Sequence, residues 1–190
     1  MARTVIGLSL AAVILSCLYM DYIDILYVGC NLAVAYDTWY MLYILKTNIY
    51  ATSIFFLAMQ LFNYLLLQLY YSNAYTVLKI IIIAQVSDVY QYVAGSYFGR
   101  NKIGWISKNK TYEGYVAGWI LTIATFYLYS GLYEISIIYL LGLFGGLCSS
   151  FFKRSLCIKD YSNMLGPHGG WIDRIDSVIL PIVAFWLKFI

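Results

Sequence analysis

Charged side chains are scarce in this sequence. Lys, Arg, Asp and Glu make up 11% of the 190 residues, and 63% of the residues are hydrophobic. Soluble domains carry about 25% charged residues, so this composition excludes an ordinary soluble protein and indicates an all-α, polytopic bundle of transmembrane helices. No low-complexity linker divides the chain. We therefore expect one integral membrane domain over residues 1–190.

Side chains that bind zinc or form disulfides are also few. The chain has one histidine and four cysteines, which are Cys17, Cys30, Cys148 and Cys157. The cysteines show no metal-ligand spacing and mostly lie in apolar segments, which is typical of small buried residues. The sequence therefore predicts neither a zinc site nor a disulfide.

The hydrophobic runs predict about seven membrane-spanning helices. We expect them near residues 4–20, 22–45, 51–71, 74–99, 115–130, 133–152 and 174–190. Cytoplasmic loops of membrane proteins are enriched in Lys and Arg, and with Arg3 on that side the two polar loops, 100–114 and 153–173, share the cytoplasmic face. Lys79, inside the fourth predicted span, and Lys188, near the C-terminus, fit this map less well.

The few charged residues gather in one stretch, residues 150–176. Asp173 and Asp176 are three apart on a predicted helix, so they lie about 60° from each other and can reach one cation together. The glycine-rich breaker at 166–170 can fold Asp160 back toward them. Three carboxylates among bases favour Mg²⁺ and the phosphates that it bridges. Alternatively, Asp173 and Asp176 favour the positive end of the next helix, and the bases follow the positive-inside rule.

A second polar region precedes the loop 100–114. Asp88, Tyr92, Gly95 and Gly99 follow helical spacing and would form one stripe, lining a polar cavity. Alternatively, the glycines form a packing seam between helices, which we favour for them. The loop itself holds four bases and one acid, which suits a polyphosphate or an anionic lipid headgroup.

Asp37 is a further acid inside a predicted span. An acid in such a position is a functional candidate by default. It could equally lie near the membrane interface, satisfied by neighbouring Tyr or Trp side chains. We favour this structural role.

The stretch 150–176 resembles the signature of the phosphatidate cytidylyltransferase (CDP-diacylglycerol synthase) family. The matching residues are Ser150, Lys153-Arg154, Lys159-Asp160, His168-Gly169-Gly170 and Asp173-Arg174-Ile175-Asp176. A second shared region matches at Asp88, Gly95, Gly99-Arg100, Gly104, Ser107, Lys110-Thr111 and Glu113-Gly114. Trp171 replaces an aliphatic residue of the family, and Lys108 a common proline. Family members are usually longer, with extra N-terminal spans, so this chain resembles a short form.

The resemblance implies transfer of a cytidylyl group from CTP to phosphatidate, giving CDP-diacylglycerol and pyrophosphate in phospholipid biosynthesis. It implies N-terminal spans in 1–73 and a catalytic part in 74–190. Mg²⁺ would be held by Asp160, Asp173 and Asp176, and a second cation such as K⁺ could bridge the same carboxylates. The phosphates would be held by the bases Lys110, Lys153, Arg154 and Lys159. Substrate contacts or orientation would come from Asp88, Thr111, Ser150, His168, Gly169, Gly170 and Arg174.

The expected partners and cellular location follow from the same resemblance. The partners are the two substrates and membrane lipid, with no nucleic acid, and a homodimer is conceivable. The expected location is a bacterial inner membrane with the active site facing the cytoplasm. Two other functions stay open: a CTP-dependent lipid-alcohol kinase, in which the γ-phosphate moves, and a small ion transporter that uses Asp88 and Asp37.

Overall fold

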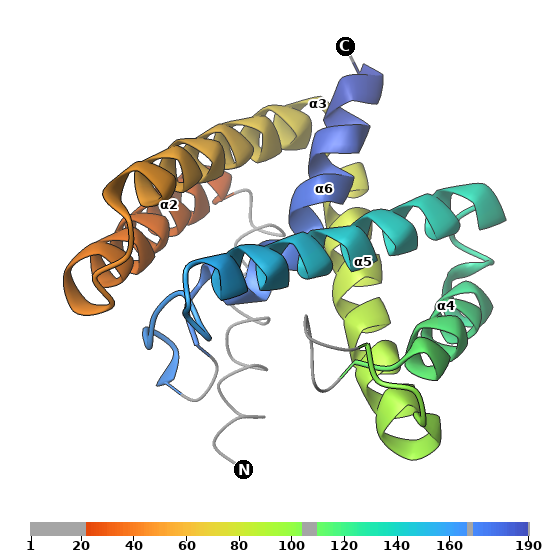
Figure 1. Ribbon diagram of the computed structural model, residues 1–190. Coiled ribbons are helices and arrows are strands. Elements are labelled where there is room, and N and C mark those ends of the chain that lie inside the picture. The colour runs from red at the N-terminus through yellow and green to blue at the C-terminus, as the bar shows by residue number, and fades with distance from the viewer. Residues whose placement is uncertain (1–21, 104–109, 167–168, 190) are drawn as a thin grey trace.

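The computed structural model describes residues 22–103, 110–166 and 169–189, and all regular elements there are helical (Figure 1). The elements are α2 (Ile23–Trp39), the π-helical turn η1 (Tyr40–Ile44), α3 (Ile49–Phe98), α4 (Tyr112–Phe126), α5 (Leu132–Ser155) and α6 (Ile172–Phe189). The prediction of an all-α fold is thereby confirmed. The predicted span at 4–20 lies outside the described residues.

Two of these helices, α3 and α5, are long and apolar enough to cross a membrane. Their most apolar windows have mean hydropathies of 1.5 and 1.9, and most residues in those windows are not buried inside the protein. A helix that is apolar outside as well as inside suits a lipid environment. The number of seven spans stays a prediction.

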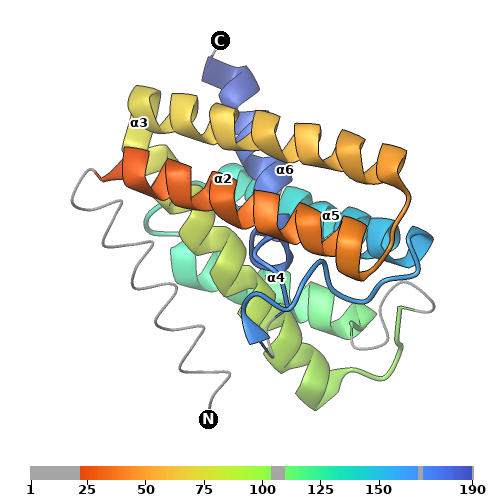
Figure 2. The same cartoon turned by 90° about the vertical axis from the view of Figure 1, so that its left-hand side faces the viewer.

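Helix α3 is broken near its middle, where the sequence predicts the end of one span and the start of the next. Asn73 has non-helical backbone angles, φ −160° and ψ 86°. Its side-chain oxygen accepts a hydrogen bond from the Thr76 N–H at 3.0 Å, so it caps the second half. The first half lies beside α2, and the second half, yellow to green, turns away from it (Figures 1 and 2). The predicted break at Ser72–Asn73 is confirmed.

The core has two parts, and the second one positions the polar loop between α5 and α6. The first part joins the second half of α3 to α5 and α6 through branched residues such as Ile80, Ile138 and Ile182, all fully buried. The second part packs α2 and η1 against the loop and the start of α6, and it includes Tyr161 and Trp171. The loop is therefore fixed by apolar packing as well as by polar contacts.

The glycines before and after the loop 100–114 form a packing seam. A Cβ on Gly95 would lie 3.0 Å from Thr111 Oγ1, and one on Gly114 would lie 2.8 Å from the Cα of Gly95. Thr111 Oγ1 accepts the Gly114 N–H at 3.1 Å and so caps α4. The predicted seam at Gly95 and Gly99 is confirmed, since a Cβ on Gly99 would also lie 2.6 Å from Thr111 Oγ1. The prediction that Tyr92 lines a polar cavity is wrong, because this residue is 71% exposed.

Candidate active site

A buried ion pair joins the two halves of the 150–176 stretch. Lys153, in the last turn of α5, lies 2.6 Å from Asp173 Oδ1 at the start of α6. The side chains are only 11% and 4% exposed. A buried charge needs a partner, so the pair fixes the end of α5 against the start of α6.

Both oxygens of Asp173 are engaged, and they organise the intervening loop. Oδ2 accepts hydrogen bonds from the Tyr161 N–H at 3.0 Å and the Gly170 N–H at 2.9 Å. Lys153 Nζ lies 5.1 Å from the centre of the Tyr161 ring, which is fully buried. Burial raises the pKa of the Tyr161 phenol, so its hydroxyl stays protonated beside Ser149, 3.1 Å away.

Asp37 belongs to this site, although the sequence favours a role at the membrane interface. Its carboxylate is fully buried and accepts hydrogen bonds from the Ser162 hydroxyl at 2.6 Å and the Ile172 N–H at 2.9 Å. It therefore connects α2 to both ends of the loop, across more than 120 residues of sequence. The predicted Tyr or Trp partners are wrong, because a serine hydroxyl and a backbone amide bind the carboxylate. The only advance signal is the acid inside an apolar segment.

The double glycine lies between these carboxylates. Gly169 has φ +79°, and a Cβ there would lie 2.8 Å from Asp173 Oδ2 and 3.3 Å from the Cβ of Asp160. A Cβ on Gly170 would lie 2.7 Å from Asp37 Oδ2. The two glycines thus let the chain pass between Asp37 on one side and Asp160 with Asp173 on the other.

Replacing Gly170 with alanine is expected to lower the free energy of unfolding by about 2 kcal/mol, because overpacking moves a buried carboxylate. The measurement is thermal unfolding in detergent micelles. Gly29→Ala is the matched control, since nothing lies within 4 Å of a Cβ there and alanine favours a helix. Equal unfolding temperatures for the two variants would contradict this close packing.

A second polar group lies one turn along α6. The carboxylates of Asp176 and of Asp88, on α3, lie close enough for their charges to interact. The positive charges of Lys110 and Lys153 also act on the Asp176 carboxylate. Lys110 Nζ is 5.7 Å from the ring centre of Tyr115. The buried Tyr115 hydroxyl has no hydrogen-bond partner in the described part of the chain. An unpartnered buried hydroxyl favours a water or ligand atom, so this group has unused binding capacity.

Several other predicted site residues bond to backbone nearby in the sequence or are exposed. Ser150 donates to the Gly146 carbonyl within its own helix, and Arg154 Nη1 donates to the Ile158 carbonyl. Lys159 and Arg174 are exposed. His168 lies outside the described residues.

The carboxylates fit Mg²⁺ by donor type, since this hard cation prefers oxygen ligands. Among the described residues, no three acidic, histidine or cysteine side chains form a ready cage. Mg²⁺ is usually held by one or two carboxylates together with substrate phosphates. Binding of Mg²⁺ by Asp160, Asp173 and Asp176 stays a prediction.

A sequence profile described as the cytidylyltransferase family matches residues 1–190. The chain belongs to this family. The resemblance seen in the two polar regions is therefore confirmed.

Curated relatives support the same assignment. A phosphatidate cytidylyltransferase of Aquifex aeolicus is 35% identical over 123 residues, covering 60% of this chain and 47% of the relative. That of Bacillus subtilis is 36% identical over 116 residues, covering 53% and 43%. One from Helicobacter pylori is 30% identical over 117 residues, covering 56% and 44%. The matches thus span less than half the length of these relatives.

Proposed function

We propose that this chain transfers a cytidylyl group from CTP to phosphatidate, forming CDP-diacylglycerol and pyrophosphate in phospholipid biosynthesis. The observation that supports the proposal is that Asp176, which lines an apolar cavity, is within electrostatic range of Asp88, Lys110 and Lys153. These residues come from four separate parts of a sequence that has few charges. The family and the names of the relatives support the same reaction.

In this reaction an oxygen of the lipid phosphate attacks the α-phosphorus of CTP. The bond from that phosphorus to the β-phosphate oxygen breaks, and pyrophosphate leaves. Such a transfer depends on positioning and on neutralising phosphate charge. We assign Lys110 and Lys153 the role of orienting and neutralising the phosphates, and the exposed Arg154 and Lys159 would contact the phosphates from solvent.

Asp160, Asp173 and Asp176 are the proposed ligands of Mg²⁺, and we propose that a second cation such as K⁺ shares these carboxylates. When bound, Mg²⁺ would neutralise the phosphate oxygens and so favour departure of pyrophosphate. Within the protein, Lys153 keeps Asp173 in place, and Asp173 in turn fixes the backbone at Tyr161 and Gly170. The ion pair thus holds one carboxylate rigidly and leaves Asp176 facing the cavity.

The proposal includes a membrane location. Two apolar helices and a bacterial membrane-enzyme family support an integral membrane protein. We propose a multi-pass protein of the bacterial inner membrane, with the site on the cytoplasmic face and with the potential to form a homodimer.

The test follows the label of CTP labelled on its α-phosphate, with phosphatidate, Mg²⁺ and purified protein in mixed micelles. We expect label in the lipid fraction and an equal amount of pyrophosphate. Label in free CDP, with a phosphorylated lipid alcohol as the second product, would establish a kinase instead. Absence of any turnover would contradict both enzyme functions and favour a transporter.

A further inference from the structure

We propose that Tyr40 is a positioning residue of the candidate active site, which acts on Asp173 through hydrogen bonds in the loop between α5 and α6. Tyr40 is the first residue of the π-helical turn η1, and its hydroxyl accepts a hydrogen bond from Asn163 Nδ2 at 2.8 Å. This inference rests on the proposed function, because Asp173 is a proposed ligand of Mg²⁺ in that reaction.

A continuous series of hydrogen bonds leads from Asn163 to Asp173. The Asn163 carbonyl accepts the Gly166 N–H at 3.0 Å, and the Gly166 carbonyl accepts the Gly169 N–H at 3.1 Å. The next amide in the chain, the Gly170 N–H, donates to Asp173 Oδ2 at 2.9 Å. Connected hydrogen bonds reinforce one another. A shift of Asn163 would therefore reach the Asp173 carboxylate through this series.

Two side chains at the end of α2 and the start of η1 hold successive residues of the loop. Asp37 and Tyr40 are three positions apart, a spacing that places two side chains on one face of a helix. Asp37 accepts the Ser162 hydroxyl at 2.6 Å, and Tyr40 contacts the next residue, Asn163. Two contacts at adjacent residues fix the direction of the loop as well as its position.

The turn η1 also contacts the loop through an apolar side chain. The Leu45 N–H donates to the Tyr40 carbonyl, five residues back, at 3.0 Å. Such π-helical turns are uncommon and often lie at functional sites. Met41, next to Tyr40, is fully buried in the same part of the core as Tyr161 of the loop. Met41 therefore fixes η1 against the loop, and the partly exposed Tyr40 reaches the polar outer turn.

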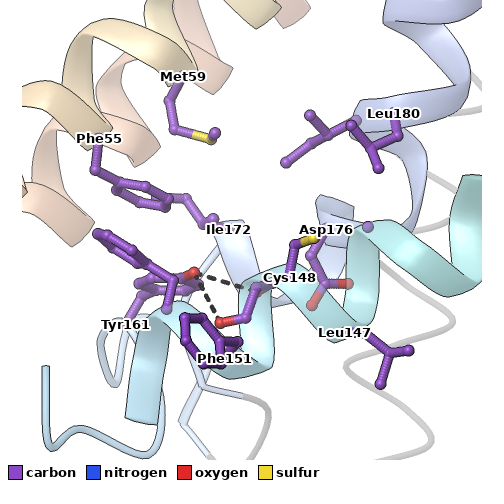
Figure 3. Close-up of a pocket in the computed structure, with 13 residues that line it drawn as sticks. Phe55, Met59, Leu147, Cys148, Phe151, Tyr161, Ile172, Asp176 and Leu180 are labelled. Atoms are coloured by element: carbon purple, nitrogen blue, oxygen red, sulfur yellow. Dashed lines mark hydrogen bonds between the residues drawn. The ribbon is translucent and has the colours of Figure 1, made fainter. Parts of the chain in front are cut away.

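The inner and outer parts of the loop are held in different ways. At the inner part, Tyr161 is fully buried, and its ring stacks on Phe55 of α3 at a centroid distance of 4.9 Å (Figure 3). At the outer part, Asn163 is exposed and Met164 is 45% exposed. Apolar burial stabilises a segment in proportion to the area removed from water. The outer turn therefore depends more than the inner part on its polar contact with Tyr40.

Hydrogen–deuterium exchange of the full-length protein in detergent micelles tests the series directly. Tyr40→Phe keeps the ring and removes the hydroxyl that accepts from the loop. Amides exchange when the local structure opens, so loss of one hydrogen bond should speed exchange at Gly166, Gly169 and Gly170 about fivefold. Tyr36→Phe is the matched control, because Tyr36 also lies on α2, with its ring centroid 6.4 Å from that of Tyr40. It should leave these rates unchanged.

A second variant removes the other side of the same contact. Asn163→Ala should speed exchange of the Gly170 amide by the same factor as Tyr40→Phe. The double variant should exchange no faster than either single variant, because residues that act through one contact are not additive. Exchange in α5 should stay unchanged in all three variants, which reports an intact fold. Multiplied effects in the double variant would show that the two side chains act separately and would overturn the proposal.

The Mg²⁺ requirement of cytidylyl transfer shows whether the effect reaches the site. Metal binding weakens in proportion to the fraction of molecules that hold the ligand in place. Tyr40→Phe should therefore raise the Mg²⁺ concentration for half-maximal turnover by as much as fivefold, through the looser hold on Asp173. Tyr36→Phe should not change it. A purely structural role of Tyr40 would lower the unfolding temperature without moving this concentration.

The alternatives give different results. Faster exchange confined to Gly166 would show that the effect ends within the outer turn, and would overturn the proposal. Faster exchange at Gly170 with an unchanged Mg²⁺ requirement would assign Tyr40 a structural role only and overturn it too. If the unmodified protein showed no cytidylyl transfer, the expected exchange at Gly170 would still support the hold of Tyr40 on Asp173 while the proposed reaction failed.

Discussion

Replacing Asp176 with asparagine should lower the kcat of cytidylyl transfer by about a thousandfold, the upper range for loss of one electrostatic group in an active site. Asparagine has the same shape, so the cavity wall is kept and only the charge is lost. Under the proposed function, Asp176 is the carboxylate that faces the substrates, with Lys110 and Lys153 acting on it. The measurement is steady-state transfer of α-phosphate label into lipid over a range of Mg²⁺ concentrations.

The matched control for this variant is Asp24→Asn. Asp24 is an exposed acid whose carboxylate accepts a hydrogen bond from the Tyr71 hydroxyl at 2.7 Å, outside the group around Asp176. It should retain normal turnover. If Asp173→Asn and Asp176→Asn both turned over normally, the proposed metal site would be wrong. A higher Mg²⁺ requirement in Asp176→Asn would support a direct role in binding the cation.

The sequence predicts the helical elements well because each has a local signal. The hydrophobic run at 133–152 corresponds to α5 at Leu132–Ser155, and the run at 115–130 to α4 at Tyr112–Phe126. Ser72-Asn73 interrupts a long apolar stretch, and the backbone turns there. The polar stretch 100–114 separates two apolar runs, and α4 begins at its end, at Tyr112. Local chemistry decides these features, so one sequence is sufficient to find them.

Which charged residues pair with each other cannot be predicted from a local stretch of sequence. Asp173 and Asp176 lie on one helix, and the sequence suggests that they share a cation. In the structure Asp173 pairs directly with Lys153, while Asp176 interacts with Asp88 and Lys110 as well. Which base meets which acid depends on how α3, α5 and α6 cross. Helical spacing describes one helix at a time and cannot give that crossing.

Asp37 likewise has partners that cannot be predicted from the sequence around it, and these partners are even more distant in the sequence. Its partners, Ser162 and Ile172, are 125 and 135 residues away in the sequence. An acid surrounded by Tyr and Trp in the sequence suggests a place at the membrane interface, and nothing local indicates that α2 reaches the polar loop. The close approach of Gly170 to this carboxylate explains in physical terms why a small residue is needed there.

Replacing Asp37 with alanine should therefore impair the site from a distance. The change leaves the Ser162 hydroxyl and the Ile172 N–H without their acceptor in a buried place, which costs about 3 kcal/mol in the free energy of unfolding. For a chain of this size that corresponds to a midpoint lower by about 10 °C. Because the loop between α5 and α6 loses its attachment to α2, kcat should also fall by about a hundredfold, as small misplacements of reacting groups do.

Thermal unfolding in micelles and the label-transfer assay measure the two effects on the same preparations. Thr38→Val is the matched control, since Thr38 is also a buried residue of α2 but donates only to the Val34 carbonyl of its own helix. Ser162→Ala removes one of the two Asp37 contacts and should give a smaller loss of both stability and activity. If Asp37→Ala lowered the midpoint without lowering kcat, Asp37 would stabilise the fold without positioning the site. A drop in kcat that Asp37→Asn largely restores would show instead that the carboxylate acts through its hydrogen bonds, because asparagine can still accept the Ile172 N–H.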